Sequence, residues 1–268
     1  MTATCVALLL LGFAQSGRDT VPSLGQRLSY RDLPVAKRHK GIEVSLVDAF
    51  SYRPYERAAE LGDTPSATID VTYSGFPPAA VTAFEYAVAI WENTISSPVP
   101  IRIIATWTTL SGTTVGQATA AVVADFPGQP IPNTWFIEAL SDKLAGIDLF
   151  PGDPDIVAQF DSAPPADWYF GLDGQPPAGD LDFVTVVLHE LGHGLGFLGS
   201  AFVDDGSGFW GIEADPGVYW PISYDRYTRA SGTPIINFAD GSAALATALT
   251  GGNLFFASPV VIDRPAIS

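Results

Sequence analysis

Residues 183–195 form an apolar segment that contains two histidines and a glutamate, and this combination restricts how the chain can fold. The apolar side chains of the segment predict a buried helix. His189 and His193 are four residues apart, so both imidazoles project from the same face of that helix. Glu190 lies about 100° further around the helix axis. Polar groups in so apolar a helix are costly to bury unless a partner satisfies them.

A divalent metal ion is the partner that this spacing favours. Two imidazoles on adjacent turns of one rigid helix can bind the same ion, while Glu190 can reach a water molecule bound to it. The chain has three histidines, and two of them are in this pattern. The sequence therefore predicts that His189 and His193 bind zinc and that Glu190 acts as a general base.

Residues 186–197, Val-Val-Leu-His-Glu-Leu-Gly-His-Gly-Leu-Gly-Phe, resemble the active-site helix of the zincin metallopeptidases. The chain is also similar to secreted bacterial zincin-like proteins. The resemblance implies an α+β fold, with a twisted mixed sheet, a backing helix and an active-site helix. It implies a zinc-dependent endopeptidase that acts on protein or peptide substrates, with Glu190 as the base. The alternative is an inactive zincin fold that serves as a binding or adhesion module on the cell surface.

The chain departs twice from the metzincin branch of that clan. Gly196 is where that branch turns its helix, but the branch then requires a ligand at position 199, which is glycine here. The branch also has a methionine turn below the zinc, whereas Met1 is the only methionine of the chain. Membership of that branch is therefore not expected.

A zinc peptidase requires a third protein ligand and an open position for water. The remaining histidine, His39, lies far upstream, so a carboxylate downstream of the motif is expected. Glu213, in a stretch that we interpret as a loop, and Asp225, in a better-ordered stretch, are the leading candidates. Asp204 and Asp205 are nearer to the motif but precede a glycine and favour a turn. The choice between these residues stays open.

Two further roles have candidates. Tyr219 or Tyr224 could donate a hydrogen bond to the oxyanion that forms during hydrolysis, although tyrosines more often serve in packing. Calcium is a second candidate cation because the chain has Asp-rich loops, although it has no EF-hand spacing.

Three strands and two helices have clear sequence signals outside this segment. Alternating apolar residues predict strands over 67–73 and 99–107, and spacings of three and four predict a helix over 79–95 between them. A strand, a helix and a strand in succession predict a βαβ unit with parallel strands. We also expect a short strand over 156–160 and a short helix over 242–249, whereas residues 260–265 resemble a strand that enters a turn.

The chain divides into three parts by composition. Residues 1–17 resemble a secretory signal peptide, because an apolar run is followed by small or polar residues, although no Lys or Arg precedes the run. Residues 18–66 contain most of the basic side chains and predict a propeptide or an N-terminal arm. Residues 67–268 form the expected zincin-like metallopeptidase domain. We therefore expect a secreted, extracellular protein, and cleavage of the signal would remove the single cysteine, Cys5.

Charge and hydropathy exclude several partners. The chain has 29 acidic and 13 basic residues, which gives a formal net charge of −16. Such a surface repels nucleic acids and anionic lipids. Apart from the N-terminal run, no stretch is apolar over a length that could span a membrane. With 47% hydrophobic and 12% aromatic residues, the chain has ample material for a folded core.

Overall fold

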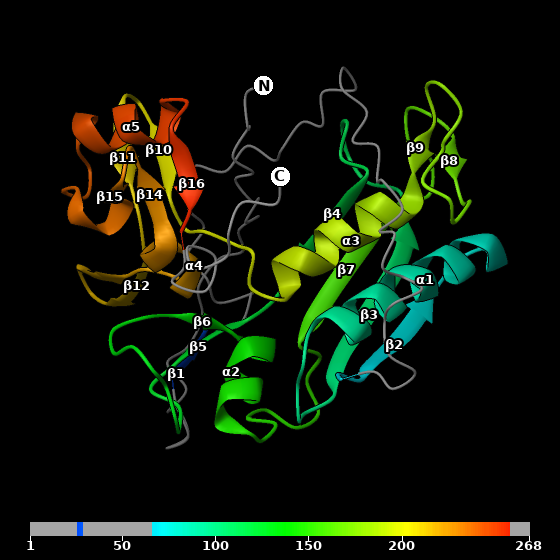
Figure 1. The fold of residues 1–268 in the computed structure, drawn as a ribbon, viewed down its shortest axis with the longest axis horizontal. Coiled ribbons are helices and arrows are strands. Elements are labelled where there is room, and N and C mark those ends of the chain that lie inside the picture. The colour runs from blue at the N-terminus through cyan, green and yellow to red at the C-terminus, as the bar shows by residue number, and fades with distance from the viewer. Residues whose placement is uncertain (1–25, 29–65, 258–268) are drawn as a thin grey trace, which may run out of the picture.

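The computed structural model describes residues 26–28 and 66–257 (Figure 1). This part of the chain contains five α-helices and several sheets. The predicted α+β class is therefore confirmed. The predicted signal peptide, most of the predicted arm and the strand expected over 260–265 lie outside the described residues.

The largest sheet of the described part has four strands in the order β2-β3-β7-β4. β2 (Ile69–Ser74), β3 (Ile101–Thr108) and β7 (Ile156–Asp161) are parallel. β4 (Gly116–Thr119) is antiparallel to β7 and forms the outer edge. Parallel pairing of β2 with β3 confirms the predicted βαβ unit, and β7 confirms the predicted strand over 156–160.

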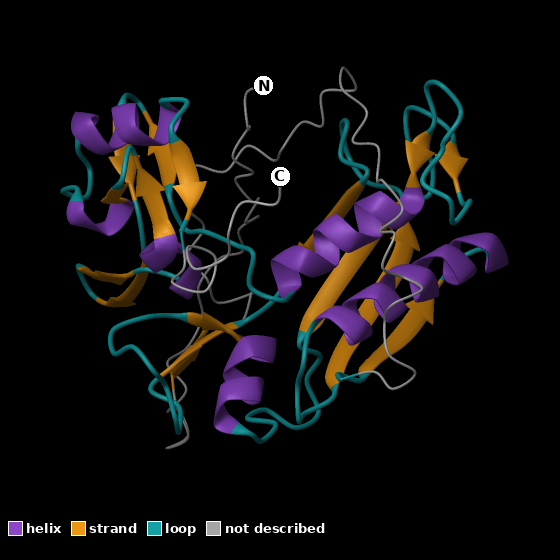
Figure 2. Ribbon diagram, in the orientation of Figure 1, coloured by secondary structure: helices purple, strands orange, loops and turns teal. Residues whose placement is uncertain are grey.

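Two helices cover one face of this sheet (Figure 2). α1 (Pro78–Thr94) begins at a proline, which is tolerated in the first turn because its missing N–H would have no helical partner there. α3 (Phe183–Gly194) is the apolar helix predicted over 183–195. Phe160 of β7 and Phe183 of α3 are buried with their ring centroids 5.3 Å apart in an edge-to-face arrangement. Such a pair stabilises the fold by about 0.5–1.5 kcal/mol beyond the contribution of the apolar area that it buries.

The C-terminal end of α3 lies very close to the sheet. A Cβ atom at Gly194 would stand 2.5 Å from Cδ1 of Ile156, so a larger residue there would push the helix away from β7. Gly196 then has a φ of +116°, which side chains rarely adopt, and the chain turns away from the helix axis. These two glycines fix where the helix meets the sheet and where it ends.

The remaining elements form three groups in Figure 1: short strands lie beside α2 (Glu138–Ala145), a two-stranded pair lies at the N-terminal end of α3, and the C-terminal elements gather beyond the C-terminal end of α3. β1 (Gln26–Leu28) pairs with β5 (Val122–Ala124), so part of the predicted arm forms a strand against the main body. The other short elements are β6 (Phe136–Ile137), β8 (Trp168–Tyr169), β9 (Leu181–Asp182), β10 (Phe202–Asp204), β11 (Ser207–Phe209), β12 (Ile212–Asp215), β13 (Val218–Trp220), α4 (Ser223–Tyr227), β14 (Thr228–Ala230), β15 (Thr233–Pro234), the 3-10 helix η2 (Ile235–Asn237), α5 (Ala243–Thr250) and β16 (Leu254–Phe256).

Several of these elements test sequence predictions. The helix predicted over 242–249 is confirmed as α5, with Ser242 accepting a hydrogen bond from the backbone N–H of Leu245. The prediction that Glu213 lies in a loop is wrong, because β12 pairs with β13 across a turn at Gly217. Among the described residues, no helix combines the length and the apolar character that a membrane-spanning helix needs.

Candidate metal centre

Helix α3 brings the two histidines of the motif together. The Nε2 atoms of His189 and His193 are 3.0 Å apart, and the two rings are nearly perpendicular, with centroids 4.5 Å apart. Two nitrogens that bind one zinc ion at about 2.0–2.1 Å in a tetrahedral arrangement lie about 3.3 Å from each other. The pair therefore fits two ligand positions of a zinc ion.

The orientation of His193 is fixed by the backbone that follows the helix. Because the chain turns at Gly196, the carbonyl of Phe197 returns to the ring, and His193 Nδ1 lies 2.8 Å from that oxygen. A carbonyl only accepts, so Nδ1 carries the proton and Nε2 presents its lone pair. Burial lowers the pKa of His193. The ring is therefore neutral and oriented as metal ligation requires.

His189 lies at the exposed end of the pair. Protein atoms packed around its ring, and then the neighbouring imidazole, lower its pKa below the ordinary value. Both histidines therefore favour the neutral form, which is the form that binds a metal.

Glu190 is buried beside the histidines, with 8% of its surface exposed. Burial raises the pKa of its carboxyl from 4.5 to about 7, and a hydrogen bond from the backbone N–H of Ala118 opposes that rise. A carboxyl group with a pKa near neutrality can both take up and release a proton at physiological pH. The position of this group next to a histidine pair suits a general base.

The edge strand β4 lies directly against Glu190. A Cβ atom at Gly116 would stand 2.9 Å from Cγ1 of Val186 and 3.1 Å from Cγ of Glu190. Glycine at this position therefore allows β4 to approach α3 closely. Since β4 pairs with β7 on one side only in the described part of the chain, the backbone groups of its other edge that do not bond to Glu190 are available to an extended chain.

Asp225 has a structural environment instead of one that suits a metal ligand. Its carboxylate is almost completely buried on α4 and accepts hydrogen bonds from the backbone N–H of Ser200 at 3.0 Å, from the hydroxyl of Ser200 and from the backbone N–H of Ile222 at 3.0 Å. Burial raises its pKa to about 6, against the effect of these bonds. A Cβ atom at Gly199 would stand 2.9 Å from Oδ1 of Asp225, so no ligating side chain could stand at position 199 without displacing this carboxylate.

The other candidates of the sequence also have local partners. Glu213 Oε1 accepts a hydrogen bond from the backbone N–H of Gly217 within the β12–β13 hairpin. Asp204 and Asp205 lie at the turn between β10 and β11, as expected. Tyr224 stacks on Phe256 with ring centroids 4.8 Å apart. Across residues 66–257, no three His, Cys, Asp or Glu side chains form a group that could hold a metal.

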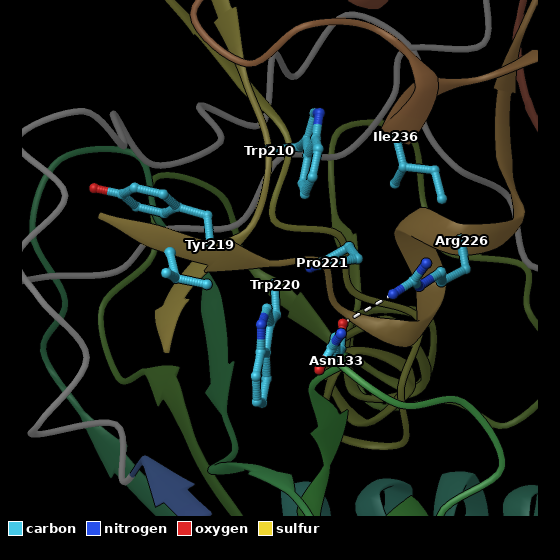
Figure 3. Close-up of a pocket in the computed structure, with 8 residues that line it drawn as sticks. Asn133, Trp210, Tyr219, Trp220, Pro221, Arg226 and Ile236 are labelled. Carbon is cyan, nitrogen blue, oxygen red and sulfur yellow. Dashed lines mark hydrogen bonds between the residues drawn. The ribbon is translucent and has the colours of Figure 1, made fainter. Parts of the chain in front are cut away.

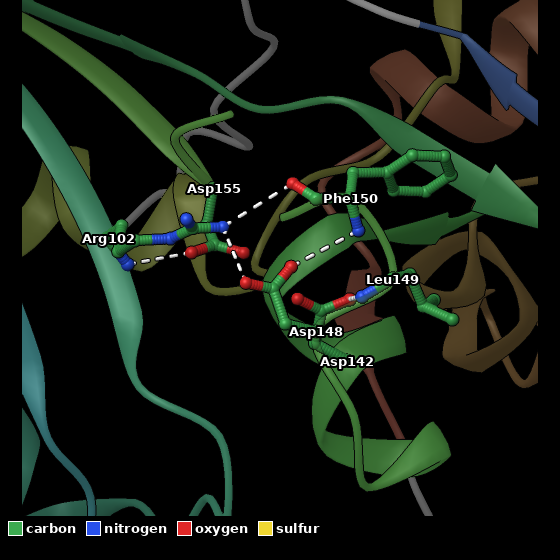
Figure 4. A network of polar contacts seen from close by, with 6 residues as sticks. All are labelled: Arg102, Asp142, Asp148, Leu149, Phe150 and Asp155. Atoms are coloured by element: carbon green, nitrogen blue, oxygen red, sulfur yellow. Dashed lines mark hydrogen bonds and ion pairs between the residues drawn. The ribbon is translucent and has the colours of Figure 1, made fainter. Parts of the chain in front are cut away.

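Carboxylates that gather near the start of β7 bear on the prediction of calcium (Figure 4). Asp148 forms an ion pair with Arg102 at 2.7 Å, and Asp155 accepts a hydrogen bond from the backbone N–H of Arg102 at 2.6 Å. Asp142 accepts one from the backbone N–H of Leu149 at 3.2 Å. These carboxylates therefore join β3, α2 and β7 by protein contacts, and calcium stays a prediction.

No protein-family model, curated protein or solved structure matches the chain. Evidence for function therefore comes from the residues of the site and their geometry.

Sequence reasoning missed the backbone groups of the site. The carbonyl of Phe197 and the amide of Ala118 both position functional side chains. Backbone groups have no sequence signature of their own, although Gly116 and Gly196 mark the places where the chain approaches or turns.

Proposed function

We propose that the protein is a zinc-dependent peptidase, with His189 and His193 as two of the zinc ligands and Glu190 as the general base. The observation that supports this most is the convergence of the two Nε2 atoms, 3.0 Å apart, beside a buried carboxyl group on the same helix. A structural metal site has no use for such a carboxyl group. Secretion, the signal peptide over 1–17 and the propeptide or arm over 18–66 belong to the same proposal.

A protein or peptide substrate would bind in an extended form along the free edge of β4. Main-chain hydrogen bonds to an edge strand fix the position of an extended chain without requiring a particular sequence. Because β4 contacts Glu190 through Gly116 and Ala118, a peptide on that edge would place a backbone carbonyl near the histidine pair.

The chemistry of the chain's own groups follows from their environment. Bound zinc would supply a Lewis acid that lowers the pKa of a water molecule and polarises a carbonyl. Glu190 would accept the proton of the attacking water and then donate it to the leaving amine. His193, held by the carbonyl of Phe197, keeps its Nε2 directed at the site.

The test is metal analysis together with hydrolysis of casein. The purified protein is expected to contain about one zinc per chain. Glu190→Gln should keep zinc and lose hydrolysis, whereas His193→Ala should lose both. Glu85→Gln is the matched control, because Glu85 is an exposed glutamate on α1 that only accepts a hydrogen bond from Tyr73. Absence of zinc from the parent protein would refute the proposal.

An inactive zincin fold that binds a partner at the cell surface is the second candidate. It is supported by the lack of a third ligand near the two histidines within residues 66–257. In that case, the parent protein would contain zinc, and neither it nor Glu190→Gln would hydrolyse casein.

A further inference from the structure

An open pocket lies away from the histidines, between the β12–β13 hairpin, α4 and η2 (Figure 3). Its volume is about 310 Å³, which is at the lower end of the range for small-molecule sites. Its lining is mainly apolar and aromatic, with two polar residues: Asn133, Trp210, Val218, Tyr219, Trp220, Pro221, Arg226 and Ile236.

Two indole rings of this pocket are held in place by the surrounding protein. Trp220 packs against the buried Trp135, with ring centroids 5.6 Å apart. Trp210 donates a hydrogen bond from Nε1 to the carbonyl of Phe238 at 3.2 Å. Because these rings are already ordered, a ligand that contacts them would not have to order them.

Arg226 provides a cationic group without a carboxylate partner in the described part of the chain. Its Nε donates to Thr134 Oγ1 at 3.0 Å, and its Nη2 donates to the carbonyl of Asn133 at 2.8 Å. Its Nη1 has no hydrogen-bond partner among the residues described. Asp225 acts on Arg226 electrostatically, but no carboxylate of residues 66–257 forms an ion pair with it. A guanidinium without an ion pair there that lines an aromatic pocket is available to an anion.

The polar groups of the pocket are mainly donors. Two donors of the lining residues, Nη1 of Arg226 and the side-chain amide of Asn133, have no acceptor among the described residues. A ligand that matches them must bring acceptor oxygens at one end and an apolar group at the other. A carboxylate satisfies a guanidinium through charge-assisted hydrogen bonds.

We propose that this pocket binds a carboxylate attached to a large apolar group, either a free apolar acid or the C-terminal residue of a peptide. The carboxylate would accept from Arg226, and the apolar group would pack against Trp210 and Trp220. This site is separate from the histidine pair, so it does not depend on the proposed peptidase activity.

The test is a titration of the intrinsic tryptophan fluorescence of the full chain, with a chelator present so that bound metal plays no part. The probes are N-acetyl-L-phenylalanine, its amide, and 3-phenylpropionate. We expect a saturable change with N-acetyl-L-phenylalanine and at least about tenfold weaker binding of the amide, because the amide loses the charge-assisted bond. Equal binding of 3-phenylpropionate would identify free acids as ligands, whereas tighter binding of the acetylated residue would favour a peptide C-terminus.

Variants separate the role of Arg226 from general damage to the fold. Arg226→Gln should weaken binding of the acid about tenfold, and Arg226→Lys should weaken it less because it keeps the charge. Arg229→Gln is the matched control, since Arg229 lies on β14 outside the pocket and donates to the carbonyl of Gly232. Thermal melting would show whether each variant folds. The proposal fails if the acid and the amide bind equally to the unmodified protein, or if neither gives a saturable change.

Discussion

Replacement of Asp142 by asparagine is expected to make the stability of the fold less sensitive to pH. Asp142 is buried, with 3% of its surface exposed, and its carboxyl group hydrogen-bonds to that of Asp155. Burial, and then the nearby charges of Asp155 and Asp148, raise the pKa of Asp142 from 3.8 to about 7. Asp142 therefore holds a proton in the folded state that it releases readily in the unfolded chain.

The sign of the pH effect follows from this difference. A group with a raised folded-state pKa contributes stability that is complete below its unfolded pKa and is lost as the pH rises through the folded value. A shift of about three units corresponds to about 4 kcal/mol. Because Asp148 and Arg102 beside it have side chains that are 30% and 32% exposed, solvent screens the cluster, and we halve that figure to about 2 kcal/mol.

Asparagine reproduces the protonated carboxyl, since its amide can donate to Asp155 and its oxygen can accept from Leu149. Denaturant unfolding at about pH 4 and about pH 8.5 should therefore show the variant gaining about 2 kcal/mol relative to the parent at the higher pH. Asp148→Asn, which removes the ion pair with Arg102, should cost about 0–1 kcal/mol at about pH 4. Because it also removes a charge that raises the pKa of Asp142, its cost should be smaller at about pH 8.5. If the difference in unfolding free energy between Asp142→Asn and the parent does not change with pH, the pKa of Asp142 is not raised in the folded state.

Two other substitutions test the candidate site. Asp225→Asn should lower the unfolding free energy by about 1–3 kcal/mol, because it disturbs the hydrogen bonds to Ser200. It should leave the zinc content unchanged. Loss of zinc at unchanged stability would instead identify Asp225 as a zinc ligand. Gly116→Ala should cost about 1–3 kcal/mol, because its methyl group would press on Glu190. It should lower casein hydrolysis more than zinc content. Gly252→Ala is the control, because no atom lies within 4 Å of the new Cβ, and it should change neither hydrolysis nor zinc content. An equal loss of hydrolysis in both variants would contradict the close approach of β4 to Glu190.

The elements that the sequence predicted correctly are those with strong local patterns. α1, α3, β2, β3 and β7 all have regular apolar spacing over six or more residues, and such periodicity depends only on neighbours along the chain. The parallel pairing of β2 with β3 followed from the strand–helix–strand order.

Short elements could not be predicted because they are stabilised by distant partners. β12 has only four residues and exists because it pairs with β13. β1 has three residues and pairs with β5, which lies almost a hundred positions further along the chain. β4 has little apolar character, and its place at the outer edge depends on β7.

The sequence by itself determined the chemistry that is available on α3. The apolar pattern of residues 183–195 predicts a helix, and within a helix histidines four residues apart share one face, with the adjacent glutamate about 100° further around the axis. Only the tertiary structure decided how these groups are held: the turn at Gly196 brings a carbonyl to His193, and β4 brings an amide to Glu190. It also decided that Asp225 forms buried hydrogen bonds with the segment after α3. Burial and hydrogen bonding arise between segments that are remote in sequence, and so no local pattern contains them.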